Sequence, residues 1–208
     1  MRAVVIGAHL KRDDIEPIAE AVPVGDLFLS GAPLSDDQPL GDRDLLLRVA
    51  ALRARLLERA TFVAIRYGLA VRSSEDALAK CAAQLPRWRR LLTEHRSKVE
   101  MTVKVAASDA RPRPQRRDFT SGADYLRALH GATKAANVDP RFREAVSRMG
   151  TARWLHRDDR SLECALLIPR DDVSRVQEAG QQLKRDFPDV PFLLSGPWPL
   201  EVFADDHE

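Results

Sequence analysis

Side chains that could carry acid–base or metal chemistry are scattered through this sequence of 208 residues. The histidines stand singly, without a partner at metal-ligand spacing: His9, His95, His130, His156 and His207. The paired aspartates lie at expected turns and helix starts, where capping explains them: Asp13/Asp14, Asp158/Asp159 and Asp171/Asp172. No glycine-rich phosphate loop, GxSxG or HExxH motif occurs. The sequence therefore predicts a protein that is not an enzyme, with no catalytic, cofactor-binding or metal-binding residues.

The two cysteines give no sign of a metal site or a disulfide. Cys81 and Cys164 are far apart, and neither belongs to a CxxC pair. Two free cysteines of this kind behave as small apolar side chains. We expect both to be buried in the core.

Positive charge is concentrated in one part of the chain. Residues 40–117 hold 18 Lys/Arg against 8 Asp/Glu, and the remainder holds 15 against 23. Such a chain can bind acidic protein surfaces, including those of a second copy of itself. The arginine-rich stretch Arg111–Arg117 could contact phosphates, but it has no aromatic residue for base stacking. We expect a solvated hinge there and no nucleic-acid partner.

Two short segments are candidates for binding a partner protein. In Gly196–Pro199 a tryptophan stands between two prolines, which restrict the backbone on both sides of it. The second segment, Arg87–Arg90, places three arginines around Trp88, which falls on an apolar helix stripe. The candidate partner-binding residues are Trp198, Pro197, Pro199, Phe203, Arg66, Arg87, Arg89 and Arg90.

The first half of the chain has the pattern of a β-α-β-α-β-α-β unit. Apolar or β-branched runs predict strands at residues 2–8, 24–30, 61–71 (bent at Gly68) and 99–105. Helices are expected at 13–21, along the stripe Leu45–Leu56, and at 74–95, where Pro86 should interrupt the helix. This order predicts a ferredoxin-like domain over residues 1–107 with one inserted helix.

The second half begins after an arginine- and proline-rich linker, residues 108–118. Residues 122–149 read as helix broken near 137–140, followed by strands at 151–156 and 162–168, a helix from Asp171, and a strand at 191–195. We expect a second ferredoxin-like domain over residues 119–208, with its first strand replaced by helix. The predicted fold class is thus α/β (α+β) with two ferredoxin-like domains.

Membrane insertion and secretion are not predicted. No apolar run approaches the roughly 20 residues that a membrane-spanning helix needs. The apolar start, residues 2–8, is typical of a first strand rather than of a signal peptide. We expect a cytoplasmic protein.

Three segments in order resemble a known family, the GvpF/GvpL gas vesicle proteins. They are Thr61–Gly68 followed by Ser74 and Glu75, Glu100–Val105 followed by Gly122–Leu126, and Gly196–Pro199 followed by Phe203. They are similar to the family's arginine-aromatic-glycine strand end, its Glu-Met-x-Val-Lys-Val strand and its Gly-Pro-Trp-Pro-Pro-Tyr-x-Phe ending. Leu200 and Glu201 stand where the family has proline and tyrosine, and Ala64-Ile65 replaces a usual proline. The chain resembles a divergent member.

The resemblance implies an accessory role in gas vesicle formation. Such proteins associate with the shell protein GvpA and with other minor gas vesicle proteins, have no known cofactor, and consist of two α/β domains. The expected location is then the cytoplasm and the gas vesicle, with self-association possible. Two alternatives stay open: a small-molecule-sensing module with paired ferredoxin-like domains, and an enzyme whose residues assemble only in three dimensions.

Overall fold

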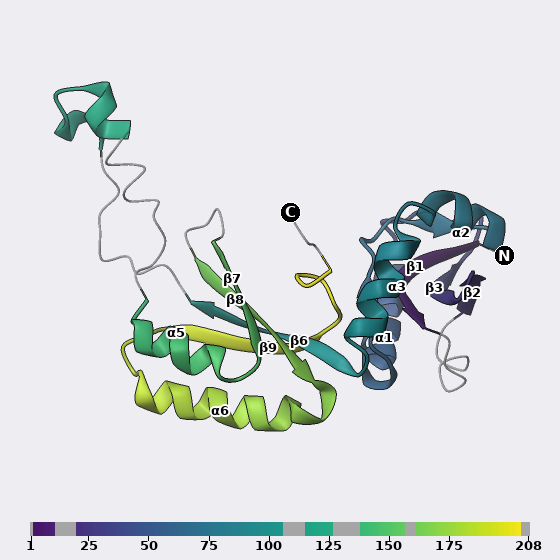
Figure 1. Cartoon of the computed structure of the whole chain (residues 1–208). Coiled ribbons are helices and arrows are strands. Elements are labelled where there is room, and N and C mark those ends of the chain that lie inside the picture. The colour runs from purple at the N-terminus through teal and green to yellow at the C-terminus, as the bar shows by residue number, and fades with distance from the viewer. Residues whose placement is uncertain (1, 11–19, 106–114, 127–137, 157–160, 205–208) are drawn as a thin grey trace. The chain divides into compact units, whose positions relative to one another are not determined.

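The chain forms two compact units, and it passes between them twice. The computed structural model describes residues 2–10, 20–105, 115–126, 138–156 and 161–204. The first unit comprises Met1–Glu100 together with Pro197–Glu208, and the second comprises Met101–Gly196 (Figure 1). Each unit is built around its own sheet.

The sheet of the first unit has β1 at its centre. Its strands are β1 (Arg2–Leu10), β2 (Glu20–Val24), β3 (Leu27–Leu34), β4 (Val63–Ala64) and β5 (Ala70–Val71). They follow the order β2-β3-β1-β4, with β5 also paired to β1, and all these pairs are antiparallel. β1 is buried almost from end to end, because both faces of this sheet are covered.

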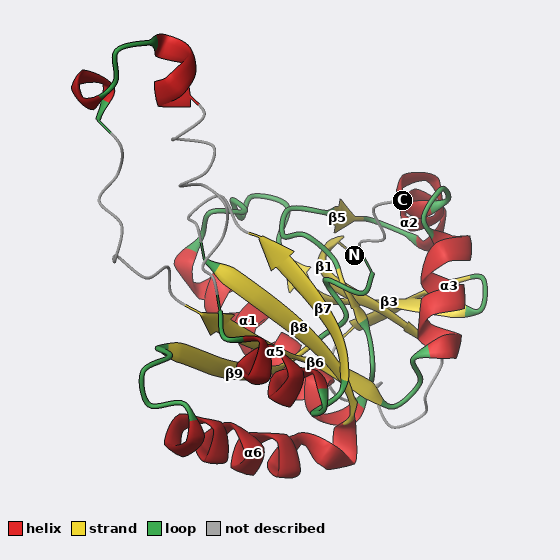
Figure 2. Cartoon of the chain, turned by 60° about the vertical axis from the view of Figure 1, so that its left-hand side comes forward, coloured by secondary structure: helices red, strands yellow, loops and turns green. Residues whose placement is uncertain are grey.

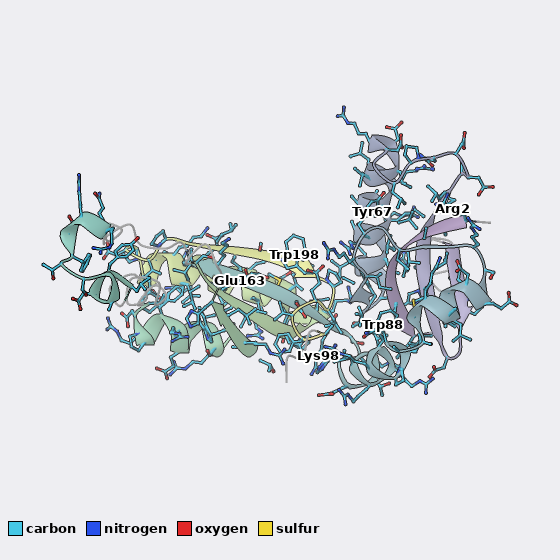
Figure 3. The ribbon with its side chains drawn as sticks, turned by 90° about the horizontal axis from the view of Figure 1, so that it is seen from above. Arg2, Tyr67, Trp88, Lys98, Glu163 and Trp198 are labelled. Atoms are coloured by element: carbon cyan, nitrogen blue, oxygen red, sulfur yellow. The ribbon has the colours of Figure 1, made fainter. Side chains whose placement is uncertain are left out.

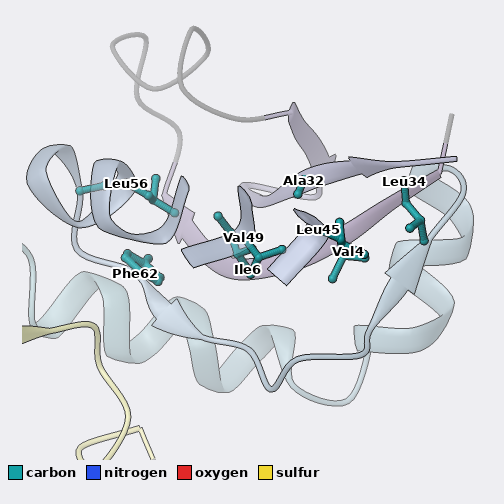
Figure 4. Close-up of a cluster of buried hydrophobic side chains, with 9 residues drawn as sticks. Val4, Ile6, Ala32, Leu34, Leu45, Val49, Leu56 and Phe62 are labelled. Atoms are coloured by element: carbon teal, nitrogen blue, oxygen red, sulfur yellow. The ribbon is translucent and has the colours of Figure 1, made fainter. Parts of the chain in front are cut away.

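One face of this sheet packs on α1 (Arg43–Arg59). The Asp42 carboxylate caps that helix by accepting the N–H of Leu45 at 2.8 Å, which helps to hold the pKa of Asp42 below its ordinary value. The stripe predicted from the sequence turns inward, and Figure 4 shows this cluster. Its labelled members are Val4, Ile6, Ala32, Leu34, Leu45, Val49, Leu56 and Phe62.

The opposite face packs on α2 (Ser74–Cys81) and α3 (Leu85–Glu94). Ala77 and Cys81 of α2 lie in one buried cluster with Val5 of β1 and Leu29 of β3. Trp88 of α3 packs against the same cluster, as its place on the apolar stripe predicts. The first unit is therefore a three-layer arrangement of helix, sheet and helices.

The second unit has a four-stranded sheet in the order β7-β8-β6-β9 (Figure 2). Its elements are β6 (Lys98–Val105), η1 (Arg116–Asp118), α5 (Pro140–Ser147), β7 (Thr151–His156), β8 (Leu162–Pro169), η2 (Arg170–Asp172), α6 (Val173–Asp186) and β9 (Phe192–Trp198). The ring of Phe142 on α5 contacts those of Phe187 and Phe192 edge-on. Gly180 on α6 lies against Leu194 of β9, so both helices pack on the same side of β9.

Both sheets have the ferredoxin-like strand order, which confirms the predicted fold class. In each, the second and third strands lie on one side of the first, and the fourth lies on the other. The second unit does not replace its first strand by helix, because β6 supplies it. The sequence analysis placed β6 in the first domain, so the observed division differs from the boundary expected at residues 108–118. Of that expected linker, residues 108–114 lie outside the described residues, and Arg116–Asp118 forms η1.

Several local predictions also change. The strand expected at 24–30 is a hairpin, because Gly25 (φ 67°) and Asp26 form a turn between β2 and β3. Of the helix expected at 13–21, residues 13–19 lie outside the described residues, and Glu20 and Ala21 begin β2. The strand expected at 61–71 is two short strands, separated by a turn at Gly68 (φ 113°).

Pro86 and Pro197 lie where the sequence predicted a helix break and the region after the last strand. The helix over 74–95 is interrupted as predicted, with α2 ending at Cys81 and Pro86 lying in the first turn of α3. The last strand is longer than predicted, since β9 runs through Pro197 to Trp198. β9 is at the edge of its sheet, where a missing N–H is tolerated.

Gly7 of β1 permits close approach of the chain at Phe62 and Val63. A Cβ atom on Gly7 would lie 2.3 Å from Cδ2 of Phe62 and 3.0 Å from the carbonyl oxygen of Val63. We therefore expect Gly7→Ala to lower the free energy of unfolding by roughly 1–3 kcal/mol, because a packed ring and a backbone atom would both have to move. Urea unfolding measures the change. Gly41→Ala is the matched control, since nothing lies within 4 Å of its Cβ position; equal stability of the two variants would contradict the packing argument.

Candidate functional site

The segment that follows Pro199 belongs to the first unit and pairs with β4. Leu200 donates its N–H to the carbonyl of Phe62 at 2.9 Å and accepts the N–H of Ala64 at 3.1 Å, forming a parallel bridge with Val63. The Leu200 side chain is fully buried. These contacts fix the backbone immediately after the Pro-Trp-Pro sequence.

A single buried carboxylate holds the next three residues. The Glu100 side chain accepts the N–H groups of Glu201, Val202 and Phe203 at 2.9, 3.0 and 2.8 Å. Three successive amides that point at one acceptor form an anion-binding concavity. We call this arrangement the Glu100 clasp. The sequence analysis noted Glu100 only within a strand motif, because no local pattern reveals a partner one hundred positions away.

Further contacts secure the segment on both sides of the clasp. Phe203 is buried, at 6% exposure, and meets the ring of His95 edge-on. The Arg87 guanidinium donates to the carbonyl of Ala204. Trp198 therefore stands just before a stretch that is held by backbone, side-chain and ring contacts.

An apolar hollow of about 440 Å³ lies beside Trp198 on the first unit. Its lining residues are Val5, Ile6, Leu46, Val49, Ala50, Arg53, Ala54, Leu57, Ile65, Tyr67, Pro197, Trp198 and Pro199. Three large side chains in this lining are exposed: Trp198 (46%), Leu46 (43%) and Tyr67 (36%). Figure 3 labels Tyr67 and Trp198. Exposed apolar side chains gathered around one hollow are typical of a protein interaction site.

A basic hollow of about 670 Å³ adjoins it, also on the first unit. Its lining residues are Arg53, Val63, Ala64, Ile65, Arg66, Tyr67, Gln84, Arg87, Trp88, Leu200, Glu201 and Ala204. Arg53, Ile65 and Tyr67 belong to both hollows. Three guanidinium groups and one carboxylate line this second hollow, so it attracts negative charge.

Five of the eight candidate partner-binding residues lie in these two hollows. The apolar hollow contains Pro197, Trp198 and Pro199, and the basic hollow contains Arg66 and Arg87. The other three lie elsewhere and are Phe203, Arg89 and Arg90.

Phe203, Arg89 and Arg90 lie outside the two hollows. Phe203 is buried and its backbone N–H belongs to the clasp, so its ring supports the segment from within. Arg89 is exposed and pairs with Asp26, with 2.6 Å between nitrogen and oxygen. Arg90 is exposed and lines neither hollow.

The outer face of α1 was missed at the sequence level. Leu46, Ala50, Ala54 and Leu57 recur at spacings of four, four and three, directly beside the core stripe. This second stripe was the sequence signal for an interaction face on α1. An α-helix that is apolar over so wide an arc has more apolar surface than one sheet can cover. Tyr67 was quoted only as part of a strand end.

Reactive and metal-binding groups are not gathered anywhere in the part of the chain that the structure describes. Within those residues, no group of three or more His, Cys, Asp or Glu side chains could hold a metal ion. Burial raises the pKa of the Cys164 thiol to about 12, and Cys81 is buried as expected. Among the described helices, none has both the length and the apolarity needed to cross a bilayer.

The chain thus consists of two ferredoxin-like units, with an apolar hollow on the first. Its sequence matches the family of gas vesicle synthesis proteins GvpL/GvpF over residues 18–204. The chain belongs to this family. A search of curated protein sequences found no significant match.

Two crystal structures of gas vesicle proteins have the same fold. GvpF from Anabaena sp. PCC7120 is 13% identical, with a TM-score of 0.70 over 100% of this chain and 98% of that one. GvpF from Microcystis aeruginosa is 12% identical, also with a TM-score of 0.70, over 98% of this chain and 99% of that one. At such identity the likeness concerns the fold, and it agrees with the family match.

The clasp predicts a strong effect of removing its carboxylate. Glu100→Ala leaves three inward-facing N–H groups without their acceptor, so we expect the free energy of unfolding to fall by about 3 kcal/mol or more. Hydrogen exchange at the amides of residues 201–203 should also become faster. Glu201→Ala makes the same truncation at an exposed side chain and should change little. Unchanged exchange in Glu100→Ala would contradict the clasp.

The clasp also predicts a pH effect. Burial raises the pKa of Glu100 above its ordinary 4.5 and outweighs the three N–H donors that lower it. The folded chain then keeps a proton on Glu100 at pH values where the unfolded chain has lost it. The stability from this proton is complete below pH 4.5 and is lost as the pH rises through the raised pKa. Glu100→Gln carries no such proton, so its unfolding free energy should vary less with pH in this window; identical pH profiles would refute the assignment.

Proposed function

We propose that this chain is an accessory protein of gas vesicle formation that acts by binding other gas vesicle proteins. The shell protein GvpA is the proposed direct partner, and the cytoplasm with its growing vesicles is the proposed location. The observation that carries the proposal is the apolar hollow, where three large exposed side chains meet in a chain of this family. The role is one of contact and assembly rather than of catalysis.

Trp198 is suited to be the main contact of this hollow. Its backbone is restricted by Pro197 and Pro199, and the contacts of Leu200 and the Glu100 clasp hold the chain beyond it. A side chain whose backbone is already ordered loses little entropy when a partner covers it. Tryptophan is among the residues that most often dominate interface energies, at 2 kcal/mol or more.

The composition of the hollow favours a partner with apolar side chains. Leucine and alanine side chains of α1 form one wall, and Trp198 with its two prolines forms another. The resemblance to the family implies a small hydrophobic shell protein as a partner, and such a protein must bury apolar surface during assembly. Covering the hollow would remove apolar area from water on both sides, which is the dominant favourable term in most protein association.

The departures from the family ending fall beside this site. Leu200 stands where the family has proline, and its N–H is used in the bridge to Phe62, a bond that proline cannot make. Glu201 stands where the family has tyrosine, and it lines the basic hollow. We therefore place any difference in partner choice from other members of the family at the basic hollow.

A second candidate function is small-molecule sensing. The volume of the apolar hollow falls within the roughly 300–1,000 Å³ of small-ligand pockets. Arg53, Tyr67 and the indole of Trp198 would supply its polar contacts. Native mass spectrometry of the purified chain tests this reading: a small molecule that copurifies, and is lost in Trp198→Ala, would favour a sensor.

Trp198→Ala tests the proposed function. Because the ring is 46% exposed, the substitution should lower the free energy of unfolding by less than about 2 kcal/mol, against 3–5 kcal/mol for a core aromatic. Capture of co-expressed shell protein by the tagged chain should be lost. Leu47→Ala is the matched control, since Leu47 is 60% exposed on α1 and lines neither hollow. Normal capture of the shell protein by Trp198→Ala, or an equal loss of capture in Leu47→Ala, would contradict the proposal.

A further inference from the structure

We infer that the basic hollow binds a carboxylate of the same partner segment whose apolar side chains fill the apolar hollow. The partner segment would then be amphipathic, with an acidic side chain next to its apolar stripe. This inference rests on the proposed function and adds the chemistry that selects the partner.

Arg53 connects the two hollows and has an unused donor. It lies on α1, lines both hollows, and donates one Nη2–H to the carbonyl of Ile65 at 3.2 Å. Its Nε atom is buried, and no described residue accepts a hydrogen bond from it. A buried N–H without an acceptor is unfavourable by about 1–3 kcal/mol. Because this Nε is closed off from solvent, a partner's carboxylate would instead approach the part of the guanidinium that lines the two hollows.

Arg66 provides a second cation that is free to receive an anion. It is exposed, and among the described residues no carboxylate pairs with it. Arg89 differs, since Asp26 already holds it. A planar guanidinium can bind a carboxylate through two parallel hydrogen bonds.

Arg87 and Glu201 complete the lining in different ways. Arg87 is fixed by its bond to the Ala204 carbonyl, so its charge has a set position. Glu201 is the carboxylate of this lining, and its backbone N–H belongs to the clasp. The lining therefore carries three positive charges and one negative charge, a net charge of +2. The apolar wall next to these guanidinium groups strengthens their attraction for a carboxylate.

The neighbouring apolar hollow favours a protein over a nucleic acid. Nucleic-acid binding depends on a row of phosphate contacts along the backbone. Here the cations end at a wall of leucine and alanine side chains of α1, which would face a phosphate chain with apolar surface. An amphipathic protein segment meets both chemistries at once.

The test compares two charge reversals of equal size. Arg66→Glu reverses a charge inside the basic hollow, and Arg55→Glu reverses an exposed one on α1 that lines neither hollow. Both should fold, as circular dichroism and melting will show, because both side chains are exposed. With tagged chain and co-expressed shell protein GvpA, Arg66→Glu should lower capture at least about tenfold, and Arg55→Glu less than about twofold. Replacing one acidic residue of the shell protein by arginine should restore capture by Arg66→Glu.

The outcomes separate this inference from the proposed function. If the unaltered chain captures no shell protein, both proposals fail. If Trp198→Ala loses capture while Arg66→Glu keeps it, only the carboxylate inference fails. Equal losses in the two charge reversals, or capture abolished by nuclease, would also overturn it. A change in the chain's own self-association with Arg66→Glu, without a change in capture, would assign the basic hollow to a second copy and refute the inference.

Discussion

The Glu100 clasp determines where residues 201–203 lie, and the apolar hollow beside Trp198 depends on that position. Burying a carboxylate away from water is unfavourable by several kcal/mol. Three hydrogen bonds from backbone N–H groups recover part of this penalty, and burial still outweighs them, so the pKa of Glu100 is raised. The clasp therefore acts mainly by selecting one arrangement: amides 201–203 find their acceptor only when the segment lies along β4.

The hollows follow from how α1 and the C-terminal segment meet the first sheet. α1 carries two adjacent apolar stripes, and the sheet covers only the inner one. The outer stripe keeps exposed leucines, and the segment around Trp198 lies next to them without closing over them. The site is thus a surface that the fold forms but does not fill, and this is why it is available to a partner.

Local periodicity was enough to predict most elements, but not their assignment to units. The alternation in residues 99–105 identified β6 as a strand, yet nothing local tells whether it joins the sheet before it or the sheet after it. The turn at Gly25 was hidden because both strands of the hairpin are apolar. For the site, the proline-flanked Trp198 was a usable signal since rigidity is a local property. The Glu100 clasp was not, because it joins residues one hundred positions apart.

The order in which the chain is synthesised gives the discontinuous first unit a particular consequence. Residues up to Glu100 emerge from the ribosome before residues 197–204, with which they form this unit. At about 5–20 residues per second, the gap lasts on the order of 5–20 s. During this time Val63 and Ala64 expose an unpaired strand edge, and Glu100 lacks the amides that will enclose it. The apolar hollow is therefore complete only after Trp198 and Pro199 have been made, so it cannot take up a partner before then.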